Sequence, residues 1–209
     1  MAMSDQDNAA YLPVSELSMG KEKLDLDVCI RGRRSVRAFN NEPVCREDIE
    51  SVLEAGVWAP TAMDREPWCF IVIQDKQLIK YVSEETKVLV QRMRPSAAEH
   101  FQAGRDVICY DAPVLILVCA KKEKEEHLNR LNLLDCVLAA ENMFLKAYEL
   151  GLGTCYMGSV SLLSYKPDVL CTVGLPDDYE LMVPFVLGHP KTEQRAGRRN
   201  EPKILKWTT

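Results

Sequence analysis

The sequence has little of what secreted, membrane-spanning or metal-binding proteins require. Its longest apolar run, 113–120, has the length of a strand and falls short of the roughly 18 residues that span a bilayer. Residues 1–20 lack a basic segment followed by an apolar one, so we expect no signal peptide. The eight cysteines form no CxxC pair, and none has a histidine at zinc-finger spacing. We therefore expect a cytoplasmic protein without a membrane segment or metal site, whose cysteines are mostly buried thiols.

Positive charge is also scarce. The 209 residues include 26 lysines and arginines against 31 aspartates and glutamates, which gives a formal net charge of −5. This balance argues against general nucleic-acid binding, which needs a broad basic face. Against that background, residues 31–39 (RGRRSVRAF) concentrate four arginines and one serine. The cluster is therefore a local concentration of positive charge rather than part of a basic surface.

The residue types in this cluster suit an anionic group. Guanidinium forks match phosphate oxygens, and a serine hydroxyl adds one more donor. In an extended segment Arg33, Ser35 and Arg37 lie on one side, and Arg34 points the other way unless the chain turns. The alternative is a solvated basic turn whose surface ion pairs contribute about 0–1 kcal/mol each. The stretch alone leaves both interpretations open.

The pattern along the chain predicts an α+β protein with an N-terminal arm (1–20) and one domain (21–209). Helices and strands do not alternate strictly, which disfavours a doubly wound sheet. Pro184 indicates an edge strand or a bulge. Hydrophobic spacing and turn residues predict a short first helix near Val28, further helices at 46–57, 76–93 and 127–150, and strands at 68–74, 113–120 and 181–188.

The predicted helix 127–150 is apolar on most of its circumference. A helix of this kind is buried, and two arrangements would bury it. It is either the central helix of a monomer or a helix at a subunit interface.

Two further segments are candidates for binding. Residues 59–68 (APTAMDREPW) describe a rigid loop that enters a strand, in which Thr61 has a hydroxyl to donate; an ordinary helix-to-strand turn is the alternative. Residues 150–160 (LGLGTCYMGSV) carry glycines that allow close backbone approach, but they do not form the GxGxxG fingerprint of a Rossmann site. No Ser-His-Asp order, HExxH or Walker sequence is present, and His189 has a structural role in our interpretation.

In this order the segments resemble the signatures of the nitroreductase family of FMN-dependent flavoproteins, and the resemblance extends from about Asp25 to Trp207. The signatures are RRSxRxF, Ala-Pro-Ser followed by Gln-Pro-Trp, Gly-Leu-Gly ending near another glycine, and Gly-x-Pro followed by a basic pair. They are matched, in chain order, by residues 33–39, 59–61 with 66–68, 151–153 with 157–158, and 188–190 with 198–199.

The resemblance implies which residues hold the cofactor. The arginine segment would hold the phosphate and ribityl end of FMN, whose phosphate carries roughly −1.5 to −2 charges at neutral pH. The 59–68 loop would lie along the isoalloxazine ring, and backbone amides of 156–158 would reach its edge near N5. The implied FMN-binding residues are Arg33, Arg34, Ser35, Val36, Arg37, Pro60, Thr61, Ala62, Asp64, Tyr156, Met157, Gly158, Arg198 and Arg199.

The resemblance also implies a fold and an activity. We expect a central, mostly antiparallel sheet flanked by helices, in an intertwined homodimer with FMN at the interface. NADH or NADPH would reduce the flavin, and a nitroaromatic, quinone or related small-molecule acceptor would then enter the same site, which is a ping-pong scheme. No side chain is expected to be catalytic, because flavin N5 carries the chemistry.

Two departures from the family pattern concern the substrate. Asp64 stands where the family often has Asn, and Glu66 stands where it has Gln, as in the iodotyrosine deiodinase branch. A carboxylate near the flavin disfavours an anionic reduced ring unless a cation offsets it, and Arg65 is the candidate cation. The alternatives are a reductive dehalogenase, a flavin-fragmenting enzyme, a non-catalytic FMN-binding module, or an α+β protein without a cofactor.

Overall fold

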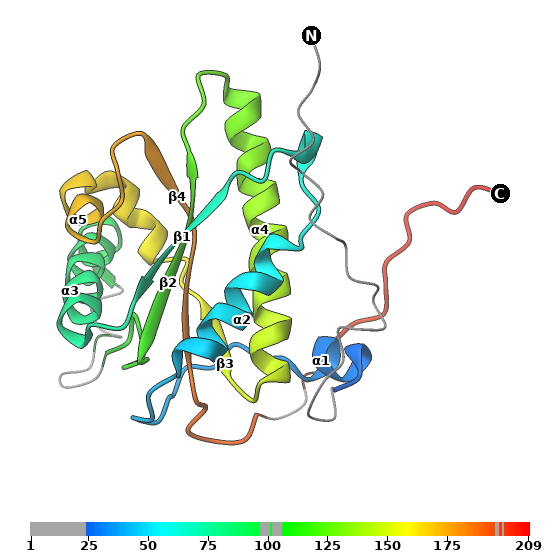
Figure 1. Cartoon of the computed structure of the whole chain (residues 1–209), viewed down its shortest axis with the longest axis horizontal. Helices are drawn as coiled ribbons and strands as arrows, with labels where there is room; N and C mark the ends of the chain where they lie inside the picture. Colours follow the sequence, from blue (N-terminus) through cyan, green and yellow to red (C-terminus); the bar gives the residue numbers. More distant parts are fainter. Residues whose placement is uncertain (1–23, 97–100, 102–105, 195–196, 198) are drawn as a thin grey trace, which may run out of the picture.

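A four-stranded antiparallel sheet forms the centre of the protein (Figure 1). The computed structural model describes residues 24–96, 101, 106–194, 197 and 199–209. The strands lie in the order β1-β2-β4-β3. Their bounds are β1 (Trp68–Ile73), β2 (Val114–Lys121), β3 (Gly153–Tyr156) and β4 (Tyr179–Gly188). The predicted α+β fold with a mostly antiparallel sheet is confirmed.

Helices cover both faces of this sheet, and Figure 1 shows α2 and α4 on one side with α3 and α5 on the other. Strand β2 explains why: its alternate residues enter two separate cores, so that Leu115 and Leu117 face one and Ile116 and Val118 the other. The helices are α1 (Leu26–Gly32), α2 (Arg46–Val57), α3 (Lys76–Met93), α4 (Glu126–Glu149) and α5 (Pro167–Thr172), with 3-10 turns η2 (Ala62–Asp64) and η4 (Val160–Tyr165).

The long helix α4 is apolar on two sides, as its sequence predicts. One side packs on the sheet through residues such as Cys136, Ala139, Ala140 and Met143. The other side leaves a row of aliphatic side chains 42–50% exposed in the single chain: Leu133, Leu134, Val137 and Leu138. The core of the single chain therefore leaves part of the helix's apolar surface uncovered.

The expected helices and strands occur within two residues of their predicted bounds. Four elements of the described residues were missed: strand β3, helix α5 and the 3-10 turns η2 and η4. The expectation of an edge strand at Pro184 is wrong, because β4 lies between β2 and β3. The expected bulge occurs nearby, where Val118 pairs with Val183 but Cys119 pairs with Leu181. Pro184 is tolerated because its missing N–H faces the side of β3, just beyond the last paired residue of that strand.

Five of the eight cysteines are buried and all eight are free, in agreement with the expected thiols. Within the described ranges, no helix has the length and apolar character to cross a membrane, and no cluster of ligating side chains could hold a metal. The predicted N-terminal arm (1–20) and Arg198 lie outside the described residues.

Candidate functional site

The arginine segment is anchored to strand β3. Ser35 forms a parallel bridge with Thr154, and the Val36 N–H donates to the Thr154 carbonyl at 2.9 Å. The Val36 side chain is buried against Gly153, where an added Cβ would lie 2.5 Å from Val36 Cγ2. Two segments that sequence analysis singled out separately are thus packed together.

This anchoring leaves the charged side chains around a basic cavity of about 410 Å³. Arg34 belongs to it together with its neighbours, because the chain turns out of helix α1 at Arg33 and is not uniformly extended. One phosphate would be met by several guanidinium groups and a hydroxyl, which suits its charge and its oxygen acceptors. The described lining residues are Arg33, Arg34, Ser35, Arg37, Gln194 and Arg199.

Arg33 also makes an ion pair within the chain. Its Nε lies 3.1 Å from the Glu141 carboxylate on α4, although the buried Nε–H is not aligned for a hydrogen bond. The solvated-turn interpretation therefore describes part of Arg33's environment. It does not explain why the other basic side chains converge on the same cavity.

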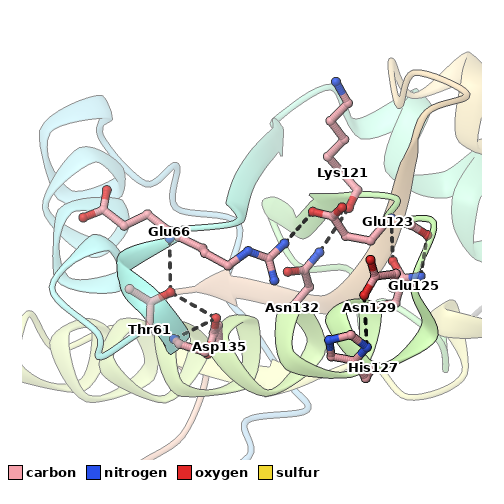
Figure 2. Close-up of polar contacts among 11 residues, drawn as sticks. Thr61, Glu66, Lys121, Glu123, Glu125, His127, Asn129, Asn132 and Asp135 are labelled. Atoms are coloured by element: carbon pink, nitrogen blue, oxygen red, sulfur yellow. Dashed lines mark hydrogen bonds and ion pairs between the residues drawn. The ribbon is translucent and has the colours of Figure 1, made fainter.

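The loop before β1 is closed by hydrogen bonds to a buried carboxylate (Figure 2). The Thr61 hydroxyl donates to Asp135 on α4 at 3.0 Å, and the Ala62 N–H donates to both Asp135 oxygens at 3.2 Å. The Thr61 oxygen accepts the Glu66 N–H at 3.1 Å. From the sequence, the Thr61 hydroxyl was a candidate donor to a ligand. In the structure it donates to Asp135 instead.

This loop has a strained backbone. Met63, Asp64 and Glu66 have φ angles of 58°, 50° and 44°, in the left-handed region that non-glycine residues rarely adopt. The Thr61 and Asp135 hydrogen bonds span this stretch and hold it in place. Asp64 and Glu66 are exposed, and Figure 2 shows the Glu66 side chain directed away from Asp135.

Arg65 does not offset the charge of Glu66 through an ion pair. Its guanidinium pairs with Glu123 instead. Asn129 fixes the Glu123 backbone, accepting the Glu123 N–H at 2.7 Å and donating to the Glu123 carbonyl at 2.8 Å. The Glu66 carboxylate makes no ion pair with any described residue.

Residues 156–158 comprise the last residue of β3 and the two residues that follow it. The Met157 amide is used by the fold, since it donates to the Pro184 carbonyl at 2.9 Å. Tyr156 is half-exposed, and its hydroxyl lies 3.4 Å from the Ser161 hydroxyl. Gly158 is exposed, and its amide donates to no backbone carbonyl of the described residues, so this amide is available to a ligand.

The arginine segment and the loop before β1 both contact helix α4. Among the described residues, the basic cavity includes none from 60–64 or 156–158. Arg33 contacts Glu141, however, and Thr61 contacts Asp135, six positions earlier on the same helix and about 9 Å away along its axis. Sequence analysis missed Asp135, Glu141 and Gln194. The available signal for Asp135 was a charged residue among the apolar positions that form the buried face of the helix.

Comparison with known proteins agrees with the family resemblance seen in the sequence. The model of the nitroreductase family matches residues 30–189. An Archaeoglobus fulgidus protein named for NADH dehydrogenase and NAD(P)H nitroreductase activity is 29% identical over 78% of this chain and 83% of its own. The crystal structure of a Bacteroides fragilis nitroreductase with bound FMN is 25% identical, with a TM-score of 0.74 over 89% of this chain and 98% of that one. A Drosophila melanogaster iodotyrosine deiodinase is 26% identical over 98% of this chain and 76% of its own.

Proposed function

Because the chain belongs to the nitroreductase family, we propose that it is an FMN-dependent oxidoreductase that takes electrons from NADH or NADPH and passes them to a small organic acceptor. The observation that carries this proposal is the basic cavity at residues 33–37, which lies beside β3 and is built from the residues of the family signature. FMN binding is also stated for the similar Bacteroides fragilis structure.

Two segments of the chain bind the phosphate end of FMN in this proposal. Arg34, Ser35 and Arg37 hold the phosphate end, and Arg33, steered by Glu141, adds its free N–H groups. Arg199 approaches the same cavity from the C-terminal segment. We propose that Arg198, which lies outside the described residues, also binds the phosphate. Their positive charge neutralises the phosphate and contributes charge-assisted hydrogen bonds.

The remaining predicted residues orient the ring. Pro60, Thr61, Ala62 and Asp64 present the backbone of the loop before β1, and Gly158 supplies an amide near the ring edge. When bound, FMN accepts a hydride from the nicotinamide and delivers it to the acceptor. The protein contributes binding, orientation and electrostatics, and nitroaromatics and quinones are the acceptors we propose.

We also propose that the working form is a homodimer. Leu133, Leu134, Val137 and Leu138 form a row of exposed aliphatic side chains on α4, which costs solvation free energy unless it is covered. In the C-terminal segment Leu205 and Trp207 are 89% and 77% exposed in the single chain. A second copy of the chain would cover both surfaces.

A reductive dehalogenase is the second candidate function. Glu66 in place of the usual Gln favours it, because its carboxylate is exposed and unpaired among the described residues. The similarity to an iodotyrosine deiodinase over nearly the whole chain supports the same candidate.

The test is purification followed by anaerobic reduction. We expect a yellow protein with flavin absorbance that bleaches on addition of NADH or NADPH and recovers with a quinone or nitroaromatic. Recovery with a halogenated tyrosine in place of those acceptors would favour the dehalogenase. A bound flavin that neither nicotinamide reduces would point to the FMN-binding module, and a colourless protein that binds no added FMN would refute the proposal.

A further inference from the structure

Asp135 is a carboxylate in an unusual setting. Asp135 is 4% exposed, on the buried face of α4 that also carries Asn132, Cys136, Ala139 and Met143. No lysine or arginine among the described residues makes an ion pair with it. Burying an unpaired carboxylate costs free energy, so a polar network has to stabilise it.

Among the described residues, the Asp135 carboxylate accepts side-chain and backbone hydrogen bonds only from the loop before β1. Its two oxygens accept the Thr61 hydroxyl at 3.0 Å and the Ala62 N–H at 3.2 Å. Thr61 in turn accepts the Glu66 N–H at 3.1 Å, so the contact reaches the far end of the loop. Figure 2 shows Asp135 below Thr61, with the loop closed around that hydroxyl.

We infer that Asp135 is a positioning residue of the flavin site, which acts through Thr61 to hold the 61–66 loop, with its three left-handed residues, in the conformation that faces the ring. The strain at Met63, Asp64 and Glu66 supports this, because a loop with three such residues relaxes unless its surroundings fix it. The inference rests on the proposed function, since it assigns this loop to the flavin.

The experiment compares variants that remove the network in two ways. D135N replaces one acceptor oxygen with a donor. Because the Ala62 N–H lies 3.2 Å from both oxygens, it faces this new donor in either orientation of the amide, and the Thr61 hydroxyl keeps its acceptor in only one of them. T61V removes the hydroxyl at a half-buried position and keeps the side chain's shape, whereas T61S keeps the hydroxyl. Three quantities are measured for each: the FMN dissociation constant, the visible circular dichroism of the protein saturated with FMN, and the thermal midpoint.

Asp106 provides a matched control. It accepts the Ser83 hydroxyl at 2.6 Å and the N–H groups of Ile108 and Cys109 at 2.8 and 2.9 Å, so it has the same kinds of donors on the opposite face of the sheet. All three donate to Oδ1, which an asparagine keeps, so D106N reports the effect of removing the charge of a hydrogen-bonded carboxylate far from the proposed flavin loop. T172V matches T61V, because the Thr172 hydroxyl donates to the Asp168 carbonyl on α5.

We expect D135N and T61V to weaken FMN binding about tenfold, which corresponds to about 1.4 kcal/mol, and to change the visible circular dichroism of the bound flavin. T61S should stay close to the wild type, and D106N and T172V should alter only the thermal midpoint. Wild-type affinity and spectrum in folded T61V, or the same losses in D106N, would overturn the inference while leaving the flavin assignment intact. Absence of FMN binding by the wild type would instead refute the proposed function.

Discussion

Ser35 and Thr154 are paired in a parallel bridge that joins the arginine segment to strand β3. The hydrogen bond from the Val36 N–H to the Thr154 carbonyl, at 2.9 Å, belongs to the same contact. It fixes Ser35 at the rim of the basic cavity and Val36 in the core. Packing of an apolar residue thus determines where the neighbouring charged residues point.

Gly153→Ala tests this coupling. An added Cβ would lie 2.5 Å from Val36 Cγ2 and 2.8 Å from Val36 Cβ, so the two segments must separate. We expect a loss of about 1–3 kcal/mol in the free energy of unfolding, the usual cost of overpacking, together with weaker FMN binding. Denaturant unfolding and flavin titration measure the two effects. As a control, Gly158→Ala meets only the edge of Tyr156 at 3.3 Å and should unfold close to the wild type.

Arg33→Ala tests the phosphate assignment. Loss of a charged hydrogen bond should weaken FMN binding by about 1.5–3 kcal/mol, measured by fluorescence titration of the apoprotein. Arg31→Ala is the matched control, since Arg31 is in the same cluster but pairs with Asp27 at 2.7 Å and does not line the cavity. Equal affinities for R33A and the wild type would remove Arg33 from the site.

The sequence predicted most elements because their hydrophobic periods were long, as in helices 46–57 and 76–93. Strand β3 was missed because only Gly153–Tyr156 forms it, and two residues on each face carry no readable period. The role of Asp135 could not be predicted, because it depends on a contact with Thr61 across 74 positions. Likewise, the direction of Arg34 depended on the turn that ends α1.

The exposed row on α4 gives a prediction about assembly. Val137→Asp places a charge in the middle of this row, at a side chain that is 48% exposed in the single chain. If a second copy covers it, burial of the new carboxylate opposes association and the protein becomes monomeric by light scattering. Val88→Asp, on α3 and 52% exposed, is the control and should remain dimeric. A monomeric wild type that still holds FMN at micromolar concentration would contradict the proposed dimer.

The buried thiols predict a loss of stability in alkaline solution. Burial raises the pKa of Cys136 from 9.0 to about 12. Below pH 9 the thiol is neutral in both states, and between pH 9 and 12 only the unfolded chain ionises, which lowers the free energy of unfolding by up to about 1.4 kcal/mol per pH unit. Urea unfolding at pH 8 and 10 measures this loss. Between these pH values the free energy of unfolding should decrease less for Cys136→Ala than for the wild type. For the control Cys171→Ala, which removes an exposed thiol, the free energy of unfolding should decrease as much as it does for the wild type.

The order of substrate binding is the last prediction, and it follows from the proposed single flavin site. The chain carries no Rossmann or Walker motif that would hold a nicotinamide apart from the flavin. Donor and acceptor must then occupy one site in turn, since both have to reach the same ring edge. Double-reciprocal plots should be parallel when NAD(P)H and a quinone are varied together, and oxidised nicotinamide should compete with the acceptor for the reduced enzyme. Intersecting lines would demonstrate a ternary complex, and therefore a separate nicotinamide site.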